Sequence, residues 1–370
     1  MHPKRLRGLL LFWLLATVVT GQEPRRDLFP FVADGKVGFI DSSGKEVVPP
    51  QFGNAGDASR FREGLANVGM ASGWGYVDAT GRSVVPGKYW WAHPFSEGLG
   101  AVQLPGEGRG WGFIDASGRL LIEGLRSASS FHDGLAAEMA GGKWGYLSRQ
   151  MKMVIEPKFS HAADFHEGRA AIEDSRKWGY IDTQGKIVIK PQYDLAMPFS
   201  NGMGRVKILV RKQALPKGLL GEEGQTQEDV FYWGAVDPNG NQLIPPQFLD
   251  LTEFRDGYAF AIPDGSHSFG IVDHHGTFVV PPRFEGASHF SESVAAVKLG
   301  NRWGYVDASG EWVIPPSFDS AEPFENGLAR AVARGGHYGY IDHSGHWVWR
   351  IDLRNEQEKT STESHNAQRR

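Results

Sequence analysis

Acidic residues beside glycine recur along this sequence, and their side chains are the first candidates for chemistry. They stand in Glu-Gly or Asp-Gly steps, or close variants, at Glu63, Glu97, Asp133, Glu167, Asp256 and Glu292. A glycosidase needs one matched pair of carboxyl groups that share the acid and base or nucleophile roles. A carboxylate that recurs in nearly every segment is instead typical of a residue that caps a turn. We therefore predict that the chain is not an enzyme.

Histidine and cysteine do not indicate a metal site. The 13 histidines are scattered, and the neighbouring ones, His274 with His275 and His343 with His346, lack the spacing of metal ligands. The chain has no cysteine, which excludes disulfides, thiolate metal sites and cysteine nucleophiles. We expect no catalytic residue, no metal and no cofactor.

Two short motifs match ligand-binding loops only in part. The segment Asp237-x-Asn239-x-Asn241 begins like a calcium loop, but Gln242 stands at the sixth position, where that loop needs glycine. The segment from Gly179 to Lys186 is one residue too long for a phosphate-binding loop and is followed by Ile187. We interpret both as parts of hairpins.

Aromatic residues are better candidates for binding. The residue before the paired aliphatic residues of the repeat described below changes along the chain from polar to aromatic, ending in Phe278, Trp312 and Trp347. A residue that only packs should keep one size, whereas a row of exposed rings can stack on sugars or anchor a protein. Trp90 and Trp91 are a second aromatic excess outside the repeat pattern. We predict that these five residues bind a ligand, and packing between units or under the C-terminal tail is the alternative.

These residues belong to a repeat with a period of about 35 residues. Its core is an aromatic residue and glycine, followed by an aromatic residue, an aliphatic residue and Asp. The nine copies are VGFID at 37–41, WGYVD at 74–78, WGFID at 111–115, WGYLS at 144–148, WGYID at 178–182, WGAVD at 233–237, FGIVD at 269–273, WGYVD at 303–307 and YGYID at 338–342. The interval between the fifth and sixth copies holds an insertion of about 20 residues.

Each copy continues with Asp-x-x-Gly, a short aliphatic run that ends at proline, and an aromatic connector that leads to the acidic-glycine step. Asp-x-x-Gly between β-prone runs indicates a tight hairpin, because Asp accepts hydrogen bonds from the turn and Gly adopts positive φ. Proline has no N–H donor and therefore ends the strand ladder. The pattern predicts a three-stranded meander in each unit, with a connector that could form one helical turn.

One meander of this length cannot bury its apolar face, so neighbouring units must stack. We predict an all-β array of about nine three-stranded units over residues 28–353. An open solenoid or superhelix is favoured over a closed β-propeller, because no strand from one end of the chain is evident to complete a unit at the other.

The recurrence of Trp-Gly, Asp-x-x-Gly and Phe-x-Glu-Gly together resembles the WG-repeat proteins, a bacterial family also described by a Lys-Trp-Gly signature. The resemblance covers roughly residues 28 to 350. Val37, Phe269 and Tyr338 depart from it by replacing Trp, and Ser148 and Met151 replace the Asp and Gly of the fourth turn. The family implies repeat modules that mediate binding, without common catalytic residues.

Three segments lie outside the repeat pattern. Residues 1–21 combine the basic residues Lys4, Arg5 and Arg7 with an apolar run and small residues, which predicts a signal peptide cleaved near Gly21. The apolar run is shorter than the ~20 residues that cross a membrane, and an uncleaved anchor is the alternative. The insertion at about 207–231 predicts a mobile surface loop that is either tolerated or contacts a partner. The tail at 354–370 is polar and predicted to be disordered.

The formal net charge is −4, so the chain lacks the basic character of a nucleic-acid-binding protein. We predict a secreted or periplasmic, non-catalytic repeat scaffold without a membrane span after signal removal. Its partner is expected to be a protein in the cell envelope or outside. The alternative is a module that binds glycan or cell wall through the C-terminal aromatic row, and an envelope hydrolase is the third hypothesis.

Overall fold

The computed structural model describes residues 28–53, 61–214 and 227–352 of the chain. All regular secondary structure in these residues is β-strand, and every strand pair is antiparallel. None of the described residues forms a helix that is long and apolar enough to cross a membrane. The all-β prediction is confirmed, whereas the predicted signal peptide at 1–21 and tail at 354–370 lie outside the described residues.

The described strands form nine successive units, each a meander of three or four strands. Unit 1 contains β1 (Phe29–Ala33), β2 (Lys36–Ile40) and β3 (Glu46–Gly53). Unit 2 contains β4 (Phe61–Arg62), β5 (Leu65–Met70), β6 (Gly73–Asp78) and β7 (Ser83–Tyr89). Unit 3 contains β8 (Trp91–Ala92), β9 (Leu99–Gln103), β10 (Trp111–Asp115) and β11 (Leu120–Leu125).

The next three units follow the same order. Unit 4 contains β12 (Leu135–Ala140), β13 (Lys143–Ser148) and β14 (Met153–Phe159). Unit 5 contains β15 (His161–Ala162), β16 (Arg169–Asp174), β17 (Lys177–Asp182) and β18 (Ile187–Tyr193). Unit 6 contains β19 (Leu195–Ser200), β20 (Met203–Ala214), β21 (Gln227–Val236) and β22 (Gln242–Leu251).

Unit 7 contains β23 (Tyr258–Pro263), β24 (Phe269–Asp273) and β25 (Phe278–Phe284). Unit 8 contains β26 (Gly286–Ser291), β27 (Val294–Leu299), β28 (Arg302–Val306) and β29 (Trp312–Ala321). Unit 9 contains β30 (Ala329–Ala333), β31 (His337–Ile341) and β32 (Trp347–Asp352). The extra first strand of units 2, 3, 5, 6 and 8 comes from the aromatic connector, so the helical turn predicted there is wrong.

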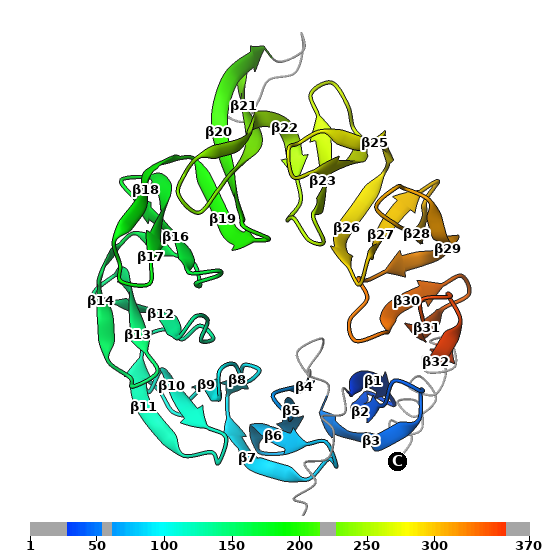
Figure 1. Cartoon of the computed structure of the whole chain (residues 1–370). Helices are drawn as coiled ribbons and strands as arrows, with labels where there is room; N and C mark the ends of the chain where they lie inside the picture. The colour runs from blue at the N-terminus through cyan, green and yellow to red at the C-terminus, as the bar shows by residue number, and fades with distance from the viewer. Residues whose placement is uncertain (1–27, 54–60, 215–226, 353–370) are drawn as a thin grey trace, which may run out of the picture.

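The units follow one another around a ring, with the last strand of each unit on the outer rim (Figure 1). Units 1 and 9 lie next to each other in this ring and are in contact. The Tyr340 hydroxyl donates a hydrogen bond to the Pro30 carbonyl at 2.7 Å, and the Phe31 and Trp349 rings are 4.6 Å apart. No described strand of unit 1 pairs with a strand of unit 9.

These contacts join the two ends of the array. The all-β array of meander units is confirmed, and no described strand of unit 1 pairs with a strand of unit 9, as expected. Contacts that involve side chains, without a shared strand, bring the two units together. Phe29, Phe31, Ile40, Leu328 and Tyr340 form a buried cluster at this junction, and three of them, Phe29, Leu328 and Tyr340, also line a small pocket.

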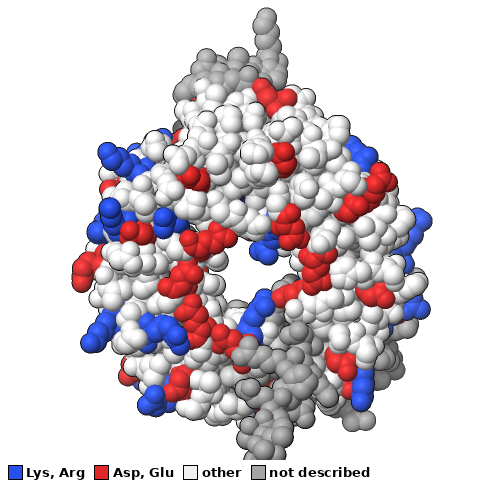
Figure 2. Space-filling view, viewed as in Figure 1, with Lys and Arg blue, Asp and Glu red and all other residues white. Residues whose placement is uncertain are grey.

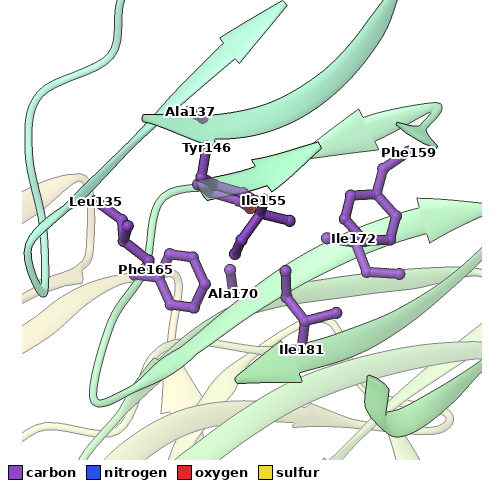
Figure 3. Close-up of a cluster of buried hydrophobic side chains, with 9 residues drawn as sticks. All are labelled: Leu135, Ala137, Tyr146, Ile155, Phe159, Phe165, Ala170, Ile172 and Ile181. Atoms are coloured by element: carbon purple, nitrogen blue, oxygen red, sulfur yellow. The ribbon is translucent and has the colours of Figure 1, made fainter. Parts of the chain in front are cut away.

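The hydrophobic core lies between the units. One cluster combines Leu135, Ala137, Tyr146, Ile155 and Phe159 of unit 4 with Phe165, Ala170, Ile172 and Ile181 of unit 5 (Figure 3). Each of these side chains is at most 7% exposed. The predicted stacking of units that cannot bury their own apolar faces is therefore confirmed.

Two repeated contacts hold neighbouring units in register. In units 2, 4, 5, 8 and 9 a tyrosine hydroxyl donates to a backbone carbonyl of the next unit: Tyr76 to His93, Tyr146 to Ala163, Tyr180 to Met197, Tyr305 to Glu322 and Tyr340 to Pro30. The Asp-x-x-Gly turn meets the preceding unit, and at Gly118 a Cβ atom would lie 3.1 Å from a methyl group of Val85. Glycine is needed here both for this close approach and for its φ of 82°.

The insertion is partly regular structure. β20 and β21 continue to pair as far as Ala214 and Gln227, so residues 207–214 and 227–231 are strands rather than the loop predicted at 207–231. Residues 215–226 lie outside the described residues. In Figure 1 this hairpin extends outward from the ring at the top of the view.

Candidate functional site

The acidic-glycine steps form tight turns that point toward the centre of the ring. In the turn of Glu97 and Gly98 both residues have positive φ, 52° and 78°. Positive φ at both central residues defines a type I′ hairpin turn, for which glycine at the second place is strongly preferred. The other turns begin with Glu63, Asp133, Glu167, Asn201, Asp256, Glu292 and Asn326, which also have positive φ. We call this set of eight turns the inner turns.

The carboxylates of the inner turns bind the turn of the following unit. Each accepts a hydrogen bond from a backbone N–H there, at 2.7–3.1 Å: Glu63 from Gly98, Glu97 from Gly134, Asp133 from Gly168, Glu167 from Asn201 and Gly202, Asp256 from Ser293, and Glu292 from Gly327. The interpretation as capping residues is therefore confirmed. The capped turn belongs to the next unit, which sequence reasoning did not foresee.

Two inner turns carry asparagine in place of a carboxylate, and both occur with arginine four residues later. After Asn201, the half-buried Arg205 donates through its guanidinium to the Leu251 carbonyl, at the end of β22 in the same unit 6, at 2.6 Å. Burial lowers the pKa of Arg205, and the nearby Glu253 and Asp250 oppose this shift. After Asn326, Arg330 pairs with Glu322.

Figure 2 shows that the acidic residues gather around the opening at the centre of the ring. They include no group of three or more His, Asp or Glu residues, among those described, that could hold a metal ion. The nearest pair of histidine rings there, His132 and His166, has centroids 4.9 Å apart. Burial lowers the pKa of His166, and the charge of His132 lowers it further. The carboxylates of the inner turns accept backbone hydrogen bonds from the following unit, so they stabilise the contacts between neighbouring units.

The C-terminal aromatic row predicted from the sequence lies in the seams between units. Phe278, Trp312 and Trp347 are each half-buried. Each meets a phenylalanine of the preceding unit edge-on: Phe278 with Phe248, Trp312 with Phe284 and Trp347 with Phe318, at centroid distances of 5.7–6.2 Å. These contacts support the packing role that was the alternative to binding, and a binding role of the three residues stays a prediction.

Trp90 and Trp91 are placed differently. Trp90 is 57% exposed and Trp91 is 38% exposed, the former being the largest exposed fraction among the large hydrophobic residues described. The Trp91 ring lies against the ring of Trp74 in unit 2, with centroids 4.5 Å apart and an interplanar angle of 47°. Lys88 is exposed beside them, with its ammonium group over the Tyr89 ring. We call Trp74, Lys88, Trp90 and Trp91 the Trp90 surface.

In three other units the residue equivalent to Trp90 is polar. There it accepts a hydrogen bond from the residue that stands just before the tryptophan of the repeat. Lys177 donates to Asp194, Arg302 to Asp319 and Lys143 to Ser160, each partner being 17 residues away. In unit 2 the corresponding residues are Gly73 and Trp90. A Cβ atom at Gly73 would lie 2.6 Å from the Tyr89 carbonyl oxygen, so this backbone excludes the usual lysine. Sequence spacing alone could have revealed this exchange of an ion pair for an exposed tryptophan.

Comparison with known proteins agrees with this architecture. The model of the WG containing repeat matches residues 38–70, 74–106, 111–144, 144–177, 178–208, 233–262, 269–303 and 303–335. No curated protein matches the sequence. A crystal structure described as the eukaryotic initiation factor has a similar fold, with a TM-score of 0.59, 12% identity, and coverage of 88% of this chain and 96% of that one. At this identity the likeness concerns the fold alone.

Two further structures are more distant. BamB from Moraxella catarrhalis has a TM-score of 0.39 at 12% identity and covers 79% of this chain and 86% of its own. The dihydro-heme d1 dehydrogenase NirN has a TM-score of 0.45 at 12% identity and covers 90% of this chain and 76% of its own. The matched repeats extend over more than half of the sequence, and each runs from the aromatic-Gly strand of one unit into the next unit. Residues 74–106, for example, contain β6 from Trp74 onward and β7 of unit 2, and β8 and β9 of unit 3. The chain belongs to the family of proteins built from the WG-containing repeat.

Proposed function

We propose that the chain is a non-catalytic scaffold that binds a protein partner through the Trp90 surface. The observation that carries this proposal is the 57% exposure of Trp90 at a position that is polar and anchored in other seams. Burying a tryptophan side chain removes ~150–250 Å² from water, and tryptophan is among the residues that contribute most to protein interfaces. Trp90 is thus suited to be the central anchor of an interface.

The neighbours of Trp90 support a protein partner. Trp91 is held by its contact with Trp74, so it would lose little conformational freedom when a partner binds. Lys88 adds a positive charge at the border of the aromatic residues. A rigid aromatic centre with a charged border is the usual composition of a protein interface.

A scaffold role also agrees with the use of the acidic residues. The carboxylates of the inner turns hold neighbouring units together, so none is free to act as the matched pair of a hydrolase. Export, predicted from residues 1–21, would place the partner in the cell envelope or outside the cell.

The glycan hypothesis now depends on different residues. The C-terminal row of Phe278, Trp312 and Trp347 is occupied in packing between units. Stacking on sugar would have to involve Trp90 and Trp91, and the experiment must therefore distinguish a protein from a glycan on the same surface.

The test is co-sedimentation of the purified chain with isolated cell-envelope material, untreated or stripped with protease. We expect binding to untreated material, loss of binding after stripping, and loss in the Trp90→Ser variant, which carries the residue found at the equivalent Ser160. Asp319→Ser is the matched control, because it changes the equivalent position of another seam. Binding that survives protease would contradict a protein partner, and equal binding by Trp90→Ser would contradict the Trp90 surface.

A further inference from the structure

The hairpin of β20 and β21 extends beyond the strands on either side of it. Pairing between β19 and β20 ends at Leu195 and Lys207, and pairing between β21 and β22 begins at Trp233 and Phe248. Between these limits β20 and β21 pair only with each other in the described part of the chain. Residues 208–214 of β20 therefore form an outer edge without a neighbouring described strand.

The first backbone donor beyond the ladder is bound by a side chain. The N–H of Leu209 donates to the Asp194 carboxylate at 2.8 Å, and the other carboxylate oxygen accepts a hydrogen bond from Lys177 at 2.5 Å. This N–H points away from β21, because it reaches a residue on the β19 side of the hairpin. The carboxylate occupies the place where a neighbouring strand would provide a carbonyl oxygen.

An apolar pair lies at the same point of the edge. Leu209 is 40% exposed and Val210 is 48% exposed, and the register of β20 shifts between Leu209 and Arg211. A bulge of this kind leaves one residue without a cross-strand partner, here Val210. Two consecutive apolar side chains therefore face solvent beside unpaired backbone.

This edge is protected by the Asp194 contact and by the bulge, but not by proline. Exposed edges are commonly interrupted by proline, and the outer strands β14, β18 and β29 contain Pro157, Pro191 and Pro316. β20 and β21 contain no proline. An apolar edge without proline can accept a partner that adds an extended strand, provided that a carbonyl of the partner replaces the Asp194 carboxylate at the Leu209 N–H.

The charges near this edge indicate which strand would fit. Lys177 donates to the Asp194 carboxylate, and the Lys207 ammonium group lies over the Phe231 and Trp233 rings of the same hairpin. A second copy that paired β20 with β20 would bring two equivalent lysines toward one another, and like charges across strands are destabilising. An extended segment with acidic residues would instead find opposite charge.

We infer that the outer edge of β20 at Ile208–Arg211 binds an extended segment of a partner protein in which acidic and β-branched apolar residues alternate. The segment would add as a strand beside β20, place its apolar residues on Leu209 and Val210, and direct its carboxylates toward Lys177 and Lys207. This site is independent of the Trp90 surface, which lies in another seam of the ring.

The test uses a fluorescein-labelled, end-blocked peptide of alternating glutamate and valine, and the same peptide with lysine in place of glutamate. Fluorescence anisotropy with the full chain should give saturable binding of the glutamate peptide and binding at least about tenfold weaker for the lysine peptide. Hydrogen exchange should slow at residues 208–211 when the glutamate peptide is bound.

Val210→Asp should weaken the glutamate peptide by about tenfold or more, because it adds a negative charge and removes an apolar contact. Val279→Asp is the matched control, since Val279 is a similarly exposed valine on an outer strand, and it should leave binding unchanged. Equal binding by the wild type and Val210→Asp, or equal binding of the two peptides, would overturn the inference. Trp90→Ser should bind the glutamate peptide normally, which separates this site from the proposed function.

Discussion

The seam between units 4 and 5 resembles the closing seam between units 9 and 1 in its tyrosine and apolar contacts. Only the first of these seams also has an inner-turn carboxylate cap among the described residues. In both, a tyrosine hydroxyl donates to a carbonyl of the next unit at 2.7 Å. Tyr146 also meets the connector residue Phe165 at 4.8 Å, whereas Tyr340 meets Phe29 of a strand at 5.5 Å. The ring therefore closes with the same chemistry that joins its units.

The difference lies at the inner turns. Between units 4 and 5 the Asp133 carboxylate caps the Gly168 N–H. Unit 1 has no inner turn among its described residues, and an ion pair between Arg62 of unit 2 and Glu325 of unit 9 bridges its place at 2.7 Å. Among the described residues, the closing seam thus keeps the apolar packing of the interior seams but has no carboxylate cap from an inner turn.

The largest expected effect comes from removing that packing. Phe31 is 2% exposed, and Phe31→Ala should lower the free energy of unfolding by about 3–5 kcal/mol, the usual cost of a large buried cavity. Chemical denaturation measures this loss. Phe165→Ala should cost a similar amount at the interior seam. Only Phe31→Ala should increase hydrogen exchange selectively in units 1 and 9, and uniform exchange in both variants would contradict a separable closing seam.

A smaller effect is expected from the tyrosine hydroxyls. Tyr340→Phe leaves the Pro30 carbonyl without its donor and should cost about 1–2 kcal/mol of unfolding free energy. Tyr146→Phe, which frees the Ala163 carbonyl, should cost the same if the two bonds are equivalent. Thermal denaturation of the two variants side by side makes the comparison, and a cost confined to Tyr146→Phe would show that the closing bond is weak.

The Asp-x-x-Gly hairpin turns should make the stability of the fold depend on pH, both within the ring and at the closing seam. The Ser117 hydroxyl, together with the Arg119 and Ser117 N–H groups, lowers the pKa of Asp115 to about 2. The Ser43 hydroxyl likewise lowers the pKa of Asp41, whose turn contacts Val348 at the closing seam. A carboxyl group with a lowered folded-state pKa stabilises the fold above its ordinary pKa of 3.8 and loses this contribution as the pH falls toward 2.

The contribution of these carboxylates to the free energy of unfolding should therefore be constant above about pH 5 and decrease below about pH 4. Asp115→Asn should reduce the decrease in unfolding free energy that acid causes. Asp41→Asn should reduce it as well, through the turn at the closing seam. Unfolding followed by circular dichroism from pH 6 to about pH 2.5 measures both. Acid sensitivity that is identical in the wild type and Asp115→Asn would contradict this origin.

The smallest effect is expected at the ion pair of Arg62 and Glu325. Their side chains are 49% and 40% exposed, and exposed pairs contribute about 0–1 kcal/mol to stability. Arg62→Gln should lower the unfolding free energy by less than about 1 kcal/mol in low salt, and the difference should shrink in high salt. A larger loss that salt does not affect would show that the pair carries more of the closure than its exposure implies.

Much of the fold was predictable because its signals are local. Asp-x-x-Gly and the acidic-glycine step define turns by backbone conformation, and the repeat period defines the units. Closure was not predictable in this way, because Phe29 and Tyr340 are separated by nearly the whole chain and no motif marks their contact. The connectors resembled helical turns in composition but formed short strands such as β8 and β15, because β9 and β16 offer them a free edge.

The candidate site was predictable only in part. Trp90 and Trp91 stood out as exceptions to the repeat, and the structure leaves them exposed. Phe278, Trp312 and Trp347 looked equally exceptional, but the volume between neighbouring outer strands accommodates large rings. The exposure of each ring depends on which residues of the neighbouring unit contact it. The residue type at one repeat position does not reveal those contacts.

The meeting of units 1 and 9 without a shared strand among the described residues has a consequence for engineering. Each unit is contiguous in sequence, so the order of units around the ring does not depend on where the polypeptide begins. A circular permutant that connects residue 352 to residue 28 through a flexible linker, and begins between units 5 and 6, should keep the same nine units and seams. In such a permutant the linker would connect units 9 and 1 covalently. The new ends would lie at the seam where Glu167 accepts hydrogen bonds from two backbone N–H groups.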